Sequence, residues 1–292
     1  MKFLIRRNLR IRVMQFLYAY YLSNTDSNFL EKTLFESIYY IYDIYIFFLN
    51  LIIILRKIII KKKFDKINYN FYFFKKNSLI ELLSKKKKII FYNYKINFLY
   101  KKKLLKFLLK KLKTINLVLN KKKYEFYRDK EFILKYYKYC FSKNKFLYKF
   151  LKNYDLTCFI NINITHIIVY NFFFLIKKKK IIYINIYKNK KQINFIKFLY
   201  KNTIFYQKYF NILIEKISQN WKITKLSIIN LIILQMAICE LIFFKKIPFK
   251  VTLNEYIEIT KIFSTKKSKI YINGILDKVV KILLNKKKLS IY

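Results

Sequence analysis

Residues 250–277 read KVTLNEYIEITKIFSTKKSKIYINGILD and contain the only glycine of the chain, Gly274. The single proline, Pro248, stands just before this stretch, and the single tryptophan, Trp221, lies further upstream. Elsewhere the chain consists mainly of Lys, Ile, Asn, Phe, Tyr and Leu, which indicates a genome biased toward A and T. Rare residue types therefore carry the most information, and they gather in the last quarter, from Trp221 to Asp277.

The spacing of apolar residues predicts three helices in this quarter. The first has apolar residues at three- and four-residue steps from Leu226 onward and must end before Pro248. The second is expected to begin with a capping box, Thr252 to Glu255, and to extend to about residue 263. Its inner face would carry Leu253, Tyr256, Ile257, Thr260 and Phe263.

The third helix is predicted over about residues 269–284 and contains Gly274. A glycine inside a helix costs about 1 kcal/mol relative to alanine. Its presence indicates either a close approach of two backbones or a glycine that is tolerated without a role beyond packing.

The N-terminus holds four of the six arginines of the chain, namely Arg6, Arg7, Arg10 and Arg12. Because lysine supplies most other positive charge, this cluster indicates a need for the planar guanidinium, which binds phosphate bidentately and stacks on bases. We interpret it as an RNA-contacting arm and first helical turn. The alternative is a solvated basic terminus.

A helix with a core-facing stripe is predicted from Leu9 onward. Its second, partly apolar face carries Gln15, Tyr18 and Leu22 and would pack either on the following insertion or on a partner protein. Residues 29–57 then read as one long helix or two, with aromatic residues that belong to a core.

Residues 61–210 are interpreted as a lysine-rich helical insertion between an N-terminal part, residues 1–60, and a C-terminal part, residues 211–292. Lysine runs beside aromatic residues can follow single-stranded RNA, but a solvated face enlarged by base composition explains these runs better. The apolar content is too high for a disordered linker, so the insertion is expected to fold. Its single histidine, His166, is expected to be buried rather than catalytic.

The formal net charge of +47 would ordinarily indicate a nucleic acid or an anionic membrane as partner. A-rich codons also produce lysine, so the position of the charge matters more than its sum. Residues 38–55, 159–176 and 226–244 are long and apolar enough to span a bilayer, but each contains polar groups that are costly there. A small basic membrane protein stays as an alternative, while the three cysteines, without metal or disulfide spacing, favour a reducing cytoplasm.

The chain offers little for catalysis. One glycine rules out a Gly-rich phosphate loop, and one histidine with three scattered cysteines cannot build the usual triads or metal clusters. The largest group of acidic residues lies in the last quarter of the chain, and its members are expected at capping or helix-pairing positions. They are Glu240, Glu255, Glu258 and Asp277. The sequence therefore predicts a binding protein with no catalytic residue, metal or cofactor.

Several separated motifs occur in an order that is known from one family. They are KVTLNEYIEI (250–259), FST (263–265), KS (267–268) and INGILD (272–277), preceded by NW (220–221), MA (236–237), EL (240–241) and IP (247–248), with RR (6–7), Arg10, Gln15 and LY (17–18) near the start and DKEFIL (129–134) between them. The chain resembles the long form of the NusB transcription antitermination family. This resemblance implies an all-α, NusB-like fold in which the termini form two small helix bundles around a long helical insertion.

The resemblance also implies a cytoplasmic RNA-binding factor that suppresses premature termination on ribosomal RNA transcripts. Such a factor binds boxA RNA together with the small-subunit ribosomal protein NusE and joins an RNA polymerase antitermination complex. By motif, RNA contacts are expected from Arg6, Arg7, Arg10, Lys250, Lys267 and Tyr271, with Glu255 capping a helix at that surface. Partner contacts are expected from Tyr18, Leu22, Asn230 and Glu240.

Two positions depart from the family pattern. Lys267 stands where many relatives have an acid, which strengthens nonspecific attraction of phosphate, and phosphate contacts position RNA more than they specify its sequence. Asn230 stands where Asp or Glu is common, which removes an ion pair with a basic partner. A second interpretation is therefore a general RNA-binding or ribosome-assembly protein of the same fold without boxA selectivity.

Overall fold

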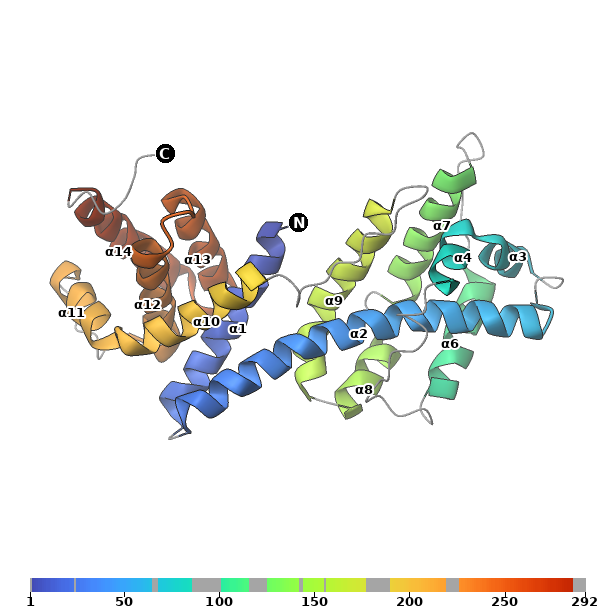
Figure 1. Cartoon of the computed structure of the whole chain (residues 1–292), viewed down its shortest axis with the longest axis horizontal. Helices are drawn as coiled ribbons and strands as arrows, with labels where there is room; N and C mark the ends of the chain where they lie inside the picture. The colour runs from blue at the N-terminus through green and yellow to red at the C-terminus, as the bar shows by residue number, and fades with distance from the viewer. Residues whose placement is uncertain are drawn as a thin grey trace. The chain divides into compact units, whose positions relative to one another are not determined.

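The computed structural model describes residues 2–23, 25–64, 68–85, 101–115, 125–141, 144–154, 156–176, 190–218 and 226–285. These residues form α-helices joined by turns, with no strand among them, so the all-α prediction is confirmed. The chain divides into two compact units (Figure 1). One unit is formed by residues 1–36 together with 187–292, and the other by residues 37–186.

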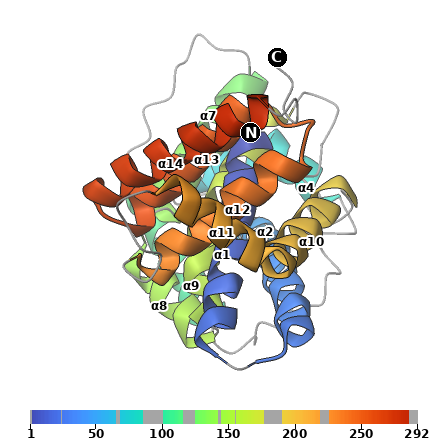
Figure 2. The ribbon, with the colours of Figure 1, turned by 90° about the vertical axis from the view of Figure 1, so that its left-hand side faces the viewer.

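The first unit is built around one central helix. Its elements are α1 (Lys2–Leu22), the start of α2 (Ser27–Lys61), α10 (Lys190–Phe205), α11 (Gln207–Ile217), α12 (Ile228–Phe243), α13 (Phe249–Phe263) and α14 (Lys266–Asn285). The helix α12 contacts α1, α10, α11, α13 and α14, which lie around it in Figure 2. Because neighbours cover it on several sides, α12 is apolar almost all round, and Ile233, Met236 and Ala237 are among its buried residues.

The three helices predicted in the last quarter are all present, but the second begins differently. The helix α12 ends at Phe243, and α13 starts at Phe249, directly after Pro248. Thr252 therefore lies inside α13, where its hydroxyl donates to Glu240 at 3.1 Å. The predicted capping box is wrong, because Pro248 with its φ of −57° already starts the first turn and the buried carboxylate of Glu240 requires donors.

The helix α14 begins at Lys266, where the hydroxyl of Thr265 accepts a hydrogen bond from the backbone N–H of Ser268 at 3.1 Å. Gly274 is exposed on this helix, and a methyl group added there would meet no atom within 4 Å outside the backbone of its own turn. Within the described part of the chain, no backbone approaches Gly274 closely, which favours the interpretation as a tolerated glycine.

Another helix prediction is refined. Residues 29–57 belong to one continuous helix, α2, rather than to two. The helices α10 and α11 meet at Tyr206. Asn220 and Trp221, expected at the entry to α12, lie outside the described residues.

The second unit has an aromatic core. Its elements are the rest of α2, α3 (Tyr69–Lys76), α4 (Ser78–Ser84), α6 (Lys101–Thr114), α7 (Glu125–Cys140), α8 (Lys145–Tyr154) and α9 (Leu156–Leu175). The ring of Phe48 on α2 stacks on His166 of α9 with centroids 5.1 Å apart. His166 is 9% exposed, as predicted, and Tyr137 of α7 hydrogen-bonds its Nδ1 at 2.8 Å.

Among the described helices, α2 alone is long and apolar enough to cross a membrane. Its most apolar window is 72% buried inside the protein. Tyr45, Phe47 and Phe48 on this helix are all fully buried. Packing in a protein core therefore accounts for the apolar character that raised the membrane alternative.

Candidate nucleic-acid interface

Arg7 of α1 is fixed at the protein surface by Glu255 of α13. Its Nε donates to Oε2 at 2.9 Å and its Nη2 donates to Oε1 at 2.8 Å, which is the bidentate geometry of a guanidinium and a carboxylate. The side chain of Arg7 is 26% exposed, whereas that of Glu255 is 7% exposed. The hydrogen bond to Glu255 raises the pKa of Arg7 above its ordinary value. Glu255 thus sets the plane of the guanidinium on an arginine side chain that stays partly exposed.

Arg10, one turn further along α1, is buried instead. Its guanidinium is 1% exposed and pairs with the fully buried carboxylate of Glu240, with Nε donating to Oε2 at 2.8 Å. Thr252 and Tyr256 each donate a hydroxyl to the same carboxylate at 3.1 Å. Burial opposes the charged form of Arg10, but the hydrogen bonds and charge of Glu240 outweigh it and raise the pKa of Arg10.

This burial does not fit two of the expected contacts. Arg10 was expected to touch RNA and Glu240 to touch a partner, yet both lie in the core of the first unit. For Arg10 the sequence signals were the scarcity of arginine and the family resemblance, and for Glu240 the signal was the resemblance alone. Only the tertiary structure separates the surface arginine, Arg7, from the core arginine, Arg10.

The other two arginines of the cluster also differ in their surroundings. The guanidinium of Arg6 lies 5.6 Å from the ring centroid of Phe195 on α10, in cation–π geometry, and is half-buried. Arg12 is 4% exposed, and its Nη1 donates to Gln15 at 3.0 Å. Arg6 and Arg7 are therefore the two arginines of the cluster that a ligand can reach.

A second acid of α13, Glu258, lies between Arg7 and lysines of the same surface. Glu258 lies 3.9 Å from Nη1 of Arg7 and accepts a hydrogen bond from Lys261. The hydrogen bond and charge of Lys261, followed by the charges of Arg7 and Lys269, lower the pKa of Glu258. Helical spacing places the exposed Lys250 on the same face as Glu258 and Lys261.

We call Arg7, Lys250, Lys261, Lys267 and Lys269 the basic surface. Lys267 is exposed in the first turn of α14, and Tyr271, one turn later, is half-buried. Both lie on α14, which packs against α13, the helix that carries Glu255. Sequence reasoning missed Lys261 and Lys269, although the spacing of Glu255, Glu258 and Lys261 on one helix is a signal that could have found them.

The expected partner residues fall in two places. Tyr18 is half-buried and Leu22 is 60% exposed at the end of α1, one turn apart on the same face. Asn230, near the start of α12, is 7% exposed, and its side chain donates to the hydroxyl of Ser268 on α14 at 3.0 Å. Leu22 is therefore the most accessible of the four expected contacts, and Asn230 mainly joins two helices.

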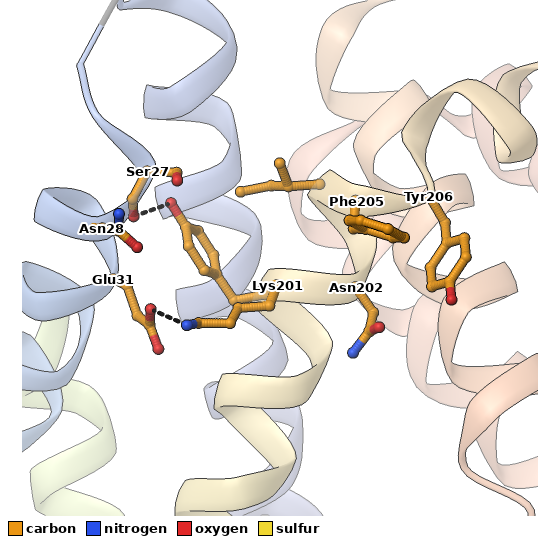
Figure 3. A pocket seen from close by; sticks show the side chains of 9 residues that line it. Ser27, Asn28, Glu31, Lys201, Asn202, Phe205 and Tyr206 are labelled. Carbon is orange, nitrogen blue, oxygen red and sulfur yellow. Dashed lines mark hydrogen bonds and ion pairs between the residues drawn. The ribbon is translucent and has the colours of Figure 1, made fainter.

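A cavity of about 510 Å³ lies between the start of α2 and the end of α10 (Figure 3). Lys201 pairs with Glu31 across it at 3.1 Å, and the hydroxyl of Tyr200 donates to the carbonyl of Ser27 at 3.3 Å. The rings of Phe205 and Tyr206 line its other side.

The described residues contain no group of three His, Cys, Asp or Glu side chains that could hold a metal ion. Burial raises the pKa of the Cys140 and Cys239 thiols to about 12, so neither is a ready nucleophile.

Comparison with known proteins identifies relatives of one family. The model of the NusB family matches residues 170–281. The transcription antitermination protein NusB of Natranaerobius thermophilus is 44% identical over 95 residues, which cover 31% of this chain and 68% of that protein. NusB of Acetivibrio thermocellus is 46% identical over 71 residues, which cover 24% of this chain and 49% of that protein. A solved structure of T. maritima NusB is 32% identical, covers 32% of this chain and 66% of that one, and has a TM-score of 0.31.

The chain thus spans about half to two thirds of the length of these curated relatives. The matched range contains Glu240 and Glu255, whereas the arginines that these acids hold lie outside it. The ion pairs join the N-terminal helix to the matched part of the chain.

Proposed function

Because the chain belongs to the NusB family of transcription antitermination proteins, which are not enzymes, we propose that it is an RNA-binding antitermination factor for ribosomal RNA transcripts. The observation that carries this proposal is the bidentate pair of Arg7 and Glu255, which holds an arginine side chain that stays 26% exposed. The four lysines of the basic surface, on the two neighbouring helices α13 and α14, are exposed or half-exposed. Such a surface suits the phosphate backbone of a short RNA segment.

In this proposal boxA RNA is bound by Arg6, Arg7, Lys250, Lys267 and Tyr271. Glu255 acts by orienting Arg7 rather than by touching RNA, since a carboxylate that faced phosphate would repel it. Arg10 contributes indirectly, because its buried pair with Glu240 ties α1 to α12 and so fixes the position of Arg7.

The proposed protein partner is the small-subunit ribosomal protein NusE, within an RNA polymerase antitermination complex in the cytoplasm. Tyr18 and Leu22 provide an accessible, partly apolar patch for it at the end of α1. Asn230 would contribute at the edge of that contact, and Glu240 would not contribute directly. The buried, free thiols of Cys140 and Cys239 are compatible with a reducing compartment.

The test is fluorescence anisotropy of a boxA RNA of about a dozen nucleotides against a scrambled RNA of equal length, near physiological salt, where nonspecific binding is weak. Selective binding of boxA that tightens when purified NusE is added would support the proposal. Leu22→Asp should abolish the effect of NusE without changing RNA binding alone. Phe29→Asp is the matched control, because Phe29 is also 60% exposed but lies on α2.

A general RNA-binding or ribosome-assembly protein without boxA selectivity is the second candidate. It is favoured by the exposed Lys267, which adds a phosphate contact at the start of α14. Equal affinity for the two RNAs, with no effect of NusE, would select this candidate.

A further inference from the structure

A row of aromatic rings runs along α10 and the C-terminal end of α12. We call Phe195, Phe198, Phe205, Tyr206, Phe243 and Phe244 the aromatic ridge. Successive centroids are 4.9 Å apart for Phe195 and Phe244, 5.3 Å for Phe244 and Phe198, 5.9 Å for Phe198 and Phe243, 5.0 Å for Phe243 and Tyr206, and 4.8 Å for Tyr206 and Phe205. The ridge is therefore continuous, and each ring touches the next.

Two rings of the ridge are open to solvent. Phe205 is 77% exposed and Phe198 is 44% exposed. They lie seven residues apart on α10, so their rings point to the same side of the helix with an axial spacing of about 10 Å. Exposed phenylalanines at this spacing contribute little to the core of the unit, which Phe195 and Leu199 already supply from the inner face.

Positive charge alternates with these open rings. Lys201 lies between Phe198 and Phe205 on the outer face of α10, and Lys197 lies beside Phe198. Lys245 and Lys246 are exposed in the turn that follows α12, next to Phe243 and Phe244 in sequence. Lys201 is 50% exposed although it pairs with Glu31, so its ammonium still faces solvent.

At its buried end, Phe195, the ridge contacts an arginine of α1. The guanidinium of Arg6 lies over the ring of Phe195, and Arg6 is adjacent in sequence to Arg7 of the basic surface. From there the rings lead along α10 to the cavity lined by Phe205 and Tyr206 (Figure 3). Arg6 thus connects the helix that carries Arg7 to the ridge.

We propose that the aromatic ridge binds the single-stranded RNA that flanks the segment held by the basic surface, with unpaired bases stacking on Phe198 and Phe205. Stacking on exposed aromatic rings, with lysines placed to meet the backbone, is the mode by which proteins bind single strands without strict sequence preference. The alternation of rings and cations favours this ligand over an apolar protein surface, for which interleaved ammonium groups would be costly to bury. This inference rests on the proposed function and adds a second, sequence-tolerant RNA site to it.

The experiment compares the core RNA of about a dozen nucleotides with the same RNA extended by about six unstructured nucleotides at its 5′ or its 3′ end. Wild-type protein should bind one of the two extended RNAs at least about five-fold more tightly than the core RNA. The double variant Phe198→Ala, Phe205→Ala should bind the core RNA unchanged and lose that gain. Phe205→Ala alone should lose part of it, and its high exposure keeps the fold intact.

The matched control is Tyr209→Ala with Ile212→Ala, since these side chains are 51% and 52% exposed on α11 and neither belongs to the ridge. This control should keep the gain from the extension. Tight binding of the core RNA with no gain from either extension, or a gain that survives in the Phe198 and Phe205 variant, would overturn the inference and leave the proposed function standing. Failure of the core RNA itself to bind would overturn both. Loss of NusE binding in the ridge variant, with RNA binding unaffected, would assign the ridge to a protein partner instead.

Discussion

Arg7 and Glu255 lie 248 positions apart in the chain and are joined by two side-chain hydrogen bonds of 2.9 and 2.8 Å. The pair connects the first helix of the protein to the helix that carries its most distinctive sequence. The Arg7 side chain stays partly exposed in this pair. A pair that served only to stabilise the fold would not need that exposure.

The first prediction concerns the surface arginine. Arg7→Ala should weaken RNA binding and lower the slope of log K against log salt by about one, because one phosphate contact is lost. The measurement is anisotropy over a salt series. Lys216→Ala, which removes an exposed lysine on α11, is the control and should change the slope less. Equal slopes for wild type and Arg7→Ala would remove Arg7 from the RNA site.

The second prediction concerns the buried ion pair. Arg10→Met should lower the free energy of unfolding by about 3–5 kcal/mol, because it leaves the carboxylate of Glu240 buried without its main partner. Chemical denaturation followed by circular dichroism measures this loss. Combining Arg10→Met with Glu240→Leu should cost less than the sum of the two single changes. Additive losses would mean that the two side chains do not act as a pair.

The third prediction concerns the single glycine. Gly274→Ala should raise the free energy of unfolding by about 0.5–1 kcal/mol, because the methyl group meets no neighbouring side chain or helix among the described residues and the unfolded chain loses freedom. The same denaturation experiment applies. A lower stability would show that the added methyl group clashes with a neighbouring atom.

The fourth prediction concerns pH. Burial lowers the pKa of His166 from its ordinary 6.5 to about 4, so between these values the unfolded chain binds a proton that the folded chain does not. Stability from this group is therefore complete above about pH 6.5 and falls as the pH drops toward 4, by up to about 3 kcal/mol.

The variant His166→Gln isolates this effect, since carboxylates titrate in both proteins alike. The difference in unfolding free energy between wild type and variant should shrink steadily from pH 7 to pH 4. A constant difference would show that His166 is not buried in its neutral form.

The sequence alone determined the helical class and most helix positions, because the spacing of apolar residues reports directly on which face of a helix is buried. The run from Leu226 to Leu241 predicted α12, and the segments around Gly274 predicted α14. Resemblance across several short motifs also identified the family, since motifs in a fixed order carry information that composition does not.

Only the tertiary structure decided what each charged residue does. Arg7 and Arg10 are the same residue type, about one turn apart on one helix, and the sequence does not distinguish their roles. Their side chains leave the helix axis in directions that differ by a rotation of about 300°. Arg7 therefore lies at the surface, whereas Arg10 points toward Glu240. The role of Thr252 was misjudged for the same reason, because its acceptor belongs to another helix. Side-chain partners that are hundreds of residues apart depend on how helices pack, and the spacing of residues within one helix does not predict that packing.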